Sequence, residues 1–181
     1  MGDIIDRIRA QHTMMVRLLG KVEKQVEKFE RGENPDLHLM GDMIQFLVTH
    51  PDQCHHPLED LLYDTLVRKV PESAGAIKDI RQEHETMARQ LRNLSQAMTS
   101  IIMEVEVSRD TFSAMASNFI ARQLHHIANE ETGLLKLARE TLSAQDLQEL
   151  QERARNSLPG QASCENLEPY AHFLDLPGKA A

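Results

Sequence analysis

The segment HPDQCHHPLEDLLY, residues 50–63, combines an apolar helical pattern with an unusual set of polar groups. Three histidines and three acidic residues stand among leucines, and prolines interrupt the segment at positions 51 and 57. The apolar stripe that runs through Met40 and Ile44 continues beyond it through Leu62 and Leu66. Because each proline removes a backbone hydrogen bond, the segment predicts a core helix with a kink near residues 50–54.

Outward from this segment, the chain divides into four long helical patterns joined by short loops. They cover roughly residues 3–31, 35–70, 72–105 and 108–142, each with apolar residues at helical spacing. Asn34 is the expected N-cap of the second helix and Pro35 its first residue. SAQD at 143–146 resembles a capping box and predicts a shorter fifth helix ending near Asn156. Since short loops make neighbours antiparallel, we expect an all-α, up-down-up-down four-helix bundle.

The domain organisation that follows is one bundle and a tail. Residues 1–157 form the predicted bundle with its fifth helix, and residues 158–181 form an irregular tail. The apolar stretch PYAHFLDL at 169–176 is expected to dock on the bundle. A content of 4% aromatic residues, without tryptophan, leaves leucine, methionine, isoleucine and alanine as the core, which favours helices.

Charge and hydropathy restrict the partners and the location. The net charge of −8 argues against nucleic acid as a main partner. No apolar run approaches the ~18 residues of a membrane span, and the first residues lack the apolar region of a signal peptide. Cys54 and Cys164 are far apart and do not suggest a pair, so a reducing cytoplasm is the simplest location.

Histidines are the compositional surprise, and four of the nine lie in apolar stripes, one per long helix. Glu59 and Glu130 each follow one of these histidines by four residues, which brings carboxylate and imidazole onto one helix face. Counted from one end of an up-down bundle, the six groups lie at ~15–22 Å along the axis. The six are His12, His55, Glu59, His84, His126 and Glu130.

Six such groups in one layer predict a metal pair. An isolated buried histidine is usually a hydrogen-bonded core residue, but two uncompensated buried carboxylates are costly. Imidazole with bridging carboxylate suits iron or manganese, with zinc as a possible substitute. A helical adaptor with a histidine-rich core and no metal is the alternative that this reasoning leaves open.

These residues resemble those of hemerythrin-like, HHE cation-binding proteins over roughly residues 3–142. The matching elements are His12, HHPLED at 55–60, EHE at 83–85 and HHIANEE at 125–131. The resemblance implies two non-haem irons inside the bundle, bridged by two carboxylates and an oxo or hydroxo group. It makes Glu59 and Glu130 the bridges. It assigns His12 and His55 to one iron, and His84 and His126 to the other.

The chain departs from the oxygen-carrier pattern at one ligand. Oxygen-carrying hemerythrins use a fifth histidine one turn after the ligand on the third helix, and that position here is Ala88. His56 is the expected replacement, because some relatives use the residue after the first histidine of the second helix. A histidine at the boundary of the site is the alternative for His56. His125 neighbours His126 in the same way but is a weaker candidate.

Other residues near the cluster have predicted supporting roles. Asp60 and Glu131 follow the two bridging carboxylates and are expected to orient ligands or to be solvated. Tyr63 is expected to hydrogen-bond a ligand or to lie at the core edge. Cys54 is interpreted as a buried or bystander thiol and His50 as kink-associated or exposed. His38 and His172 are expected at the surface.

The predicted function is that of a cytoplasmic non-haem di-iron protein. It binds or senses a small diatomic molecule, O₂ or NO, or redox state, or it simply binds iron. The alternative is a di-iron enzyme that handles peroxide or NO, or an iron donor for the repair of iron–sulfur centres. Against the donor, no Cys-rich companion domain is visible; a sensor would need a separate protein partner, which the sequence does not identify.

Overall fold

The computed structural model describes residues 2–157, 164 and 167–174, and this part of the chain consists of helices joined by loops, without strands. Its α-helices are α1 (Ile4–Glu30), α2 (Leu37–His50), α3 (His56–Lys69), α4 (Ala74–Ile102), α5 (Arg109–Thr132), α6 (Leu134–Thr141) and α7 (Ala144–Ser157). A π-helical turn, η1 (Pro51–His55), joins α2 to α3, and 3₁₀ turns form η2 (Pro71–Ser73) and η3 (Glu168–Tyr170). The all-α prediction is confirmed.

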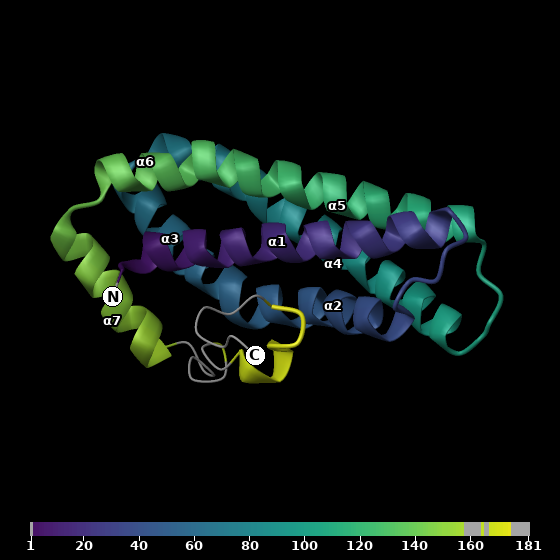
Figure 1. Ribbon diagram of the computed structural model, residues 1–181. Helices are drawn as coiled ribbons and strands as arrows, with labels where there is room; N and C mark the ends of the chain where they lie inside the picture. The colour runs from purple at the N-terminus through teal and green to yellow at the C-terminus, as the bar shows by residue number, and fades with distance from the viewer. Residues whose placement is uncertain (1, 158–163, 165–166, 175–181) are drawn as a thin grey trace.

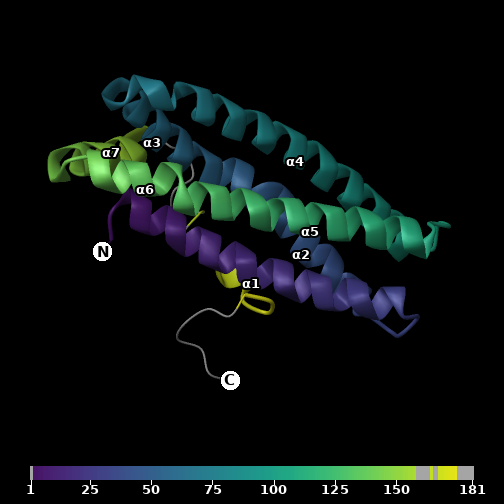
Figure 2. The ribbon, with the colours of Figure 1, turned by 90° about the horizontal axis from the view of Figure 1, so that it is seen from above.

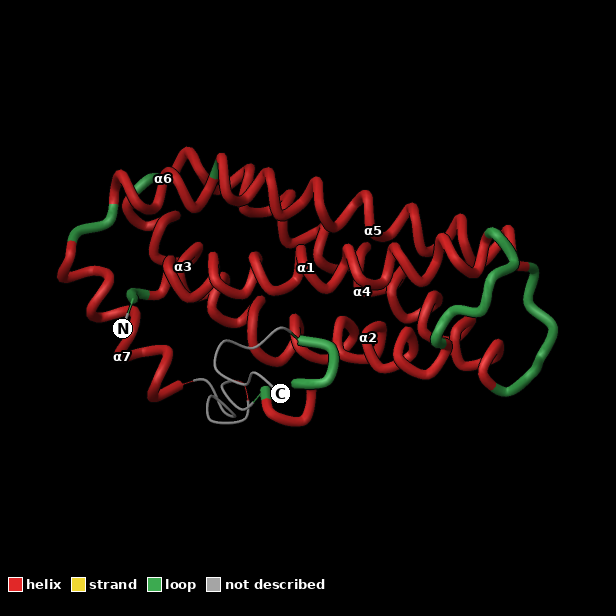
Figure 3. Tube along the Cα trace, in the orientation of Figure 1, coloured by secondary structure: helices red, strands yellow, loops and turns green. Residues whose placement is uncertain are grey.

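Four long rods build the bundle, and the second and fourth rods are composite. The second consists of α2, η1 and α3, and the fourth of α5 and α6. Figures 1 and 2 show that successive rods run in opposite directions along the bundle, with α7 turning back across one end. The connections between rods are short, as Figure 3 shows. Side chains at one height on all four rods can therefore meet in the interior.

A π-helical turn lies where the kink in the second rod was predicted. The N–H of His56 donates to the carbonyl oxygen of Pro51, five residues earlier. Pro57 has no N–H, so a regular helical bond to the carbonyl of Gln53 cannot form there. Single π-helical turns inside α-helices are frequent at functional sites. Here the turn carries His55 and leads directly into His56.

Two helix boundaries differ from the predictions. The N-cap of α2 is Asp36, not Asn34, because the Asp36 carboxylate accepts the N–H of Leu39 at 2.9 Å. The fourth pattern, expected to be continuous, breaks at Gly133, where φ is −104° and ψ is −94°. A Cβ at Gly133 would lie 2.8 Å from the carbonyl oxygen of Asn129, so the break depends on glycine.

The start of the fifth helix agrees with its predicted capping box. The N–H of Asp146 donates to Ser143 Oγ at 3.2 Å, and the N–H of Ser143 donates to Asp146 Oδ2 at 3.0 Å. The reciprocal bonds fix the point at which α7 begins. Gln151 on α7 donates to the carbonyl of Gly2 at 3.0 Å, which ties this helix to the first residues of the chain.

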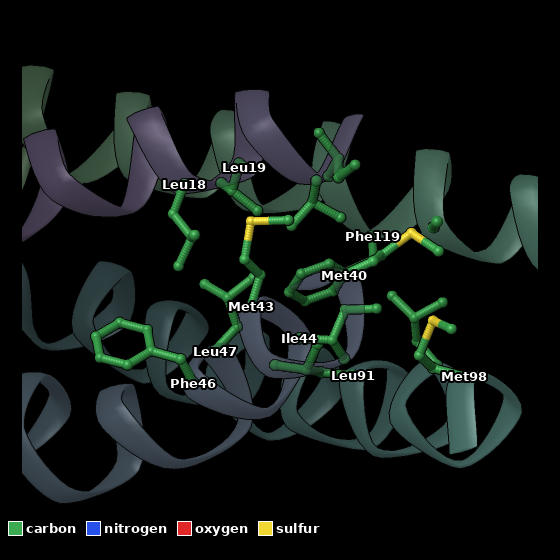
Figure 4. Close-up of a cluster of buried hydrophobic side chains, with 14 of the residues drawn as sticks. Leu18, Leu19, Met40, Met43, Ile44, Phe46, Leu47, Leu91, Met98 and Phe119 are labelled. Carbon is green, nitrogen blue, oxygen red and sulfur yellow. The ribbon is translucent and has the colours of Figure 1, made fainter. Parts of the chain in front are cut away.

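The core consists of two apolar clusters with a polar layer between them. One cluster joins α1, α2, α4 and α5, with Leu19, Met40 and Phe119 among its buried members (Figure 4). The other brings together the first turns of α1, the helix α3, the start of α4, and the helices α6 and α7. His12 lies on α1 between the residues of the two clusters. Each large buried apolar side chain contributes roughly 1.5–3 kcal/mol, so the clusters hold the rods rigidly on both sides of the layer.

A C-terminal strap, defined here as Cys164 and residues 167–174, lies against the bundle. Phe173 and Leu174 are buried in the first apolar cluster, so the predicted docking of PYAHFLDL is confirmed as far as Leu174; positions 175 and 176 lie outside the described residues. Phe46 contacts the rings of Tyr170 and Phe173 edge-on, at 4.7 and 5.8 Å between centroids. The division into a bundle domain and a separate tail at residue 157 stays a prediction.

Cys54 and Cys164 form a disulfide, which corrects the interpretation of both as unpaired. Their separation of 110 residues concealed the pairing, because only the folded chain brings the strap to η1. Disulfides persist mainly in oxidising compartments, so the cysteines no longer support a reducing one. No helix in the described part of the chain is long and apolar enough to cross a bilayer.

Candidate metal centre

All four rods contribute polar side chains to the layer between the apolar clusters. His12 comes from α1, His55 from η1, Glu59 from α3, His84 from α4, and His126 and Glu130 from α5. Five of the six are buried, with Glu59 and Glu130 fully so, and the His84 side chain is 12% exposed. The structure therefore brings together the six groups that helical spacing placed in one layer.

Imidazole nitrogens face carboxylate oxygens across the centre of the layer. His55 Nε2 lies 3.0 Å from Glu59 Oε1, and His126 Nε2 lies 3.3 Å from Glu130 Oε2. His12 Nε2 lies between the two glutamates, 3.4 Å from Glu59 Oε1 and 3.3 Å from Glu130 Oε2. His84 Nε2 completes the set at 3.6 and 3.7 Å from the same two side chains. These atoms surround a small common volume.

Three overlapping groups in the described part of the chain have the spacing that a metal ion requires. They are His12, His55, Glu59 and Glu130; His84, His126 and Glu130; and His56, Glu59 and His84, with the candidate ligand atoms of each group within 4.8 Å of one another. Glu130 belongs to two of the groups, and so does Glu59. Shared carboxylates are an arrangement by which neighbouring metal ions can be bridged.

Unsatisfied polar atoms at the same place show that the residues fit a cation. His12 Nε2, both carboxylate oxygens of Glu59 and Oε2 of Glu130 are buried without a hydrogen-bond partner. The short contacts to His12 therefore lack hydrogen-bond geometry. Each such atom costs about 1–3 kcal/mol, and more when charged. Nitrogen and oxygen donors of this kind suit iron, manganese or zinc, and a bound cation would satisfy all four atoms.

Three hydrogen bonds orient the imidazoles from outside. The Nδ1 atom of His12 lies 2.8 Å from Glu131 Oε1, that of His55 lies 3.0 Å from Gln11 Oε1, and that of His126 lies 2.8 Å from Glu83 Oε2. An oxygen at Nδ1 holds the proton there and leaves Nε2 as the ligand atom, with its direction fixed. The layer therefore presents three pre-oriented nitrogens.

Two of these orienting residues were missed in the sequence, and one was found. Glu131 has the predicted supporting position, and Arg9 Nε donates to its other oxygen at 3.0 Å. Gln11 and Glu83 carried a weak signal, since each directly precedes a candidate ligand on its own helix. Each, however, supports a histidine of a different helix, His55 or His126, which only the packed bundle reveals.

Tyr63 and Asp60 have different roles although both follow Glu59 closely on α3. The hydroxyl of buried Tyr63 donates to Glu130 Oε1 at 2.8 Å, and burial together with the Glu59 and Glu130 charges raises the pKa of Tyr63 well above its ordinary value. It therefore stays a donor and holds a bridging candidate in place. Asp60 instead accepts a hydrogen bond from Arg81 Nε at 2.8 Å at the surface. Of the two roles predicted for Asp60, orienting a ligand or being solvated, the structure therefore shows the second.

His56 lies at the edge of the layer. Its ring stacks on that of His84, with centroids 4.0 Å apart and planes at 15°, and its Nδ1 lies 3.1 Å from Asp52 Oδ1. That contact leaves Nε2 for the group that His56 forms with Glu59 and His84. By contrast, His125 is exposed, as are His38 and His172. His50 is buried at the start of the kink, with its ring stacked on Phe46.

Electrostatics in the layer favour a bound cation. Burial alone would disfavour a charge on His12, but the carboxylates of Glu130 and Glu59 outweigh it and raise the pKa of His12 to about 10. Burial likewise opposes ionisation of Glu59, yet His55 and His12 hold the pKa of its carboxyl well below its ordinary value. The two glutamates are thus anionic and require positive charge between them, from a proton on His12 or from a metal.

Comparison with known proteins gives one result for this chain. The family model described as the hemerythrin HHE cation-binding domain matches residues 3–138. Searches of curated proteins and of solved structures gave no match. The matched region covers about three quarters of the 181-residue chain and includes all seven candidate ligands. The helical bundle, the buried histidine and glutamate layer and this match together establish that the chain belongs to the hemerythrin HHE cation-binding domain family.

Proposed function

We propose that the layer binds two non-haem iron ions and that the protein binds or senses O₂ or NO through them. His12 and His55 would hold one ion, His84 and His126 the other, and Glu59 and Glu130 would bridge the two. The observation that carries this proposal is the set of buried, unpartnered ligand atoms on two shared carboxylates. Manganese and zinc suit the same donors, so the donor set supports metal binding in general and the choice of iron is the more specific part of the proposal.

A small cavity beside the layer supports a diatomic ligand. It has a volume of about 30 Å³, and its wall includes His56, His84, Met87, Ala88 and Phe119. A volume of this size holds one or two water-sized molecules. Ala88 occupies the place where oxygen carriers have a fifth histidine, so its small side chain keeps that part of the wall open.

The chain's own residues would hold the ions, orient them and limit access to them. An iron pair supplies electrons and a coordination position for a small molecule. Gln11, Glu83 and Glu131 fix the imidazoles, and Tyr63 fixes Glu130. The apolar clusters on both sides keep water from the layer. Besides the histidines, the small cavity is lined by two titratable residues, Asp52 and Arg92.

Metal analysis followed by rapid mixing tests the proposal. Protein purified without added metal is expected to contain iron and to absorb in the near ultraviolet and visible. After anaerobic reduction, mixing with O₂ in a stopped-flow instrument should give a spectrum that persists and reverses when O₂ is removed. Rapid consumption of O₂ or peroxide would instead identify the enzyme alternative. A stable, colourless protein without metal would refute both.

His56 is expected to be a ligand, and His125 provides a matched control. Replacing His56 with alanine should weaken binding of one of the two irons about tenfold or more and change the visible spectrum. Replacing His125, which is also adjacent in sequence to a candidate ligand but is exposed, should change neither. Iron content after dialysis and the absorption spectrum are the measurements. Unchanged values for the His56 variant would leave it as a boundary histidine.

A further inference from the structure

A second cavity, unrelated to the metal layer in its chemistry, lies between α1, the end of α2 and the C-terminal strap. Its volume is about 320 Å³, which is within the range of small-molecule sites. Leu18 on α1 and Leu167, Phe173 and Leu174 of the strap form an apolar wall. The disulfide through Cys164, which also lines the cavity, holds the strap over it. The space is therefore formed by tertiary structure and is bordered by a covalently tethered strap.

His50 lines this cavity and has a polar atom without a hydrogen-bond partner among the described residues. The residue is only 6% exposed, and its Nε2 is buried without a hydrogen-bond partner. Stacking on Phe46, with ring centroids 4.6 Å apart, fixes the imidazole. None of the other described residues lining the cavity has a buried atom left in this way. Since unsatisfied buried groups are rare in native proteins, a ligand atom is the natural partner for this one.

Charge selects the kind of ligand. Arg17 and Lys21 line the cavity, and no acidic side chain does so among the described residues. Lys21 Nζ donates to the carbonyl of Phe173 at 2.8 Å, which binds the strap to α1 beside the cavity. A cationic side and an apolar wall within one cavity fit a molecule with an anionic head and an apolar body.

We propose that this cavity binds an apolar monocarboxylic acid. The carboxylate is held by His50 and Arg17, and the chain lies along Leu18, Phe173 and Leu174. The proposal does not depend on which metal, if any, occupies the layer. Gln11 lines the cavity and also lies 3.0 Å from His55 Nδ1, so the two sites share one wall.

Calorimetric titration of the full-length, disulfide-bonded protein with decanoate tests the assignment. We expect saturable binding of one decanoate per chain. Decanol, which lacks the charge, and butyrate, which lacks the chain, should each bind about tenfold more weakly or worse. The His50→Phe variant keeps a stacking ring but removes Nε2, and Arg17→Gln removes the charge. Each substitution should weaken the affinity for decanoate about tenfold and change the affinity for decanol by less than about twofold.

Two tryptophan variants on the exposed side of α1 locate the site. Thr13 lines the cavity and Val16 does not, although both are exposed. The Thr13→Trp substitution should block decanoate binding, whereas the Val16→Trp variant should bind decanoate with normal affinity. Circular dichroism should show that both variants are folded. Non-saturable binding, equal affinity in the Thr13→Trp variant or equal loss in the Val16→Trp variant would overturn the proposal. So would full affinity in both the His50→Phe and Arg17→Gln variants.

Discussion

Replacing Glu59 with alanine is expected to leave the protein with less than about half of its metal, the largest loss for any single ligand. Glu59 belongs to two of the three ligand groups, and both of its oxygens are buried without hydrogen-bond partners. Its removal therefore takes a donor from each metal position and also removes a bridge. Metal content per chain, measured by elemental analysis after dialysis against metal-free buffer, is the test.

Asp60→Ala is the matched control for this variant. Asp60 is the next residue on the same helix but pairs with Arg81 at the surface. Its replacement should leave the metal content unchanged and alter stability by less than about 1 kcal/mol, the usual limit for an exposed ion pair. If the Glu59→Ala variant retained its full metal content, Glu59 would not be a bridging ligand. If both variants lost metal, the loss would reflect damage to α3 rather than a missing ligand.

Helical periodicity was sufficient to place the six central residues in one layer. His12 and His84 depended only on counting along long, regular helices, where the rise per residue is nearly constant. Glu59 and Glu130 followed because a spacing of four residues returns a side chain to the same face. The structure confirms that these side chains converge, whereas their ligation of a metal stays a prediction.

Tertiary contacts between distant residues could not be derived in the same way. Gln11 and Glu83 each support a histidine on another helix, and neither pairing has a local signature. The bond between Cys54 and Cys164 depends on where the strap docks. The break at Gly133 was missed because the apolar stripe continues across it, whereas the crowding against the Asn129 carbonyl is visible only in the backbone.

Removing the metal is expected to lower the melting temperature by about 8–16 °C at neutral pH. A ligand present at about a thousandfold excess over its Kd stabilises the folded state by about 4 kcal/mol, and 1 kcal/mol corresponds to about 2–4 °C in a chain of this size. The buried glutamates make the loss specific to this layer, because their own oxygens are left without partners once the cation is gone. Thermal unfolding followed by circular dichroism, before and after treatment with a chelator, measures it; equal melting temperatures would show that no metal binds the folded layer.

The metal-free protein should in addition become less stable as the pH rises, whereas the loaded protein should not. The pKa of His12 is raised to about 10 in the folded chain, so its proton stabilises that chain fully below about 6.5, the unfolded value, and is lost as the pH approaches 10. Between pH 7 and 9 the expected loss is about 1 kcal/mol, or about 2–4 °C, for each pH unit. With metal bound, Nε2 carries no proton and this dependence disappears. A metal-free protein whose melting temperature is constant over this range would show that no proton on His12 takes the place of the cation between Glu59 and Glu130.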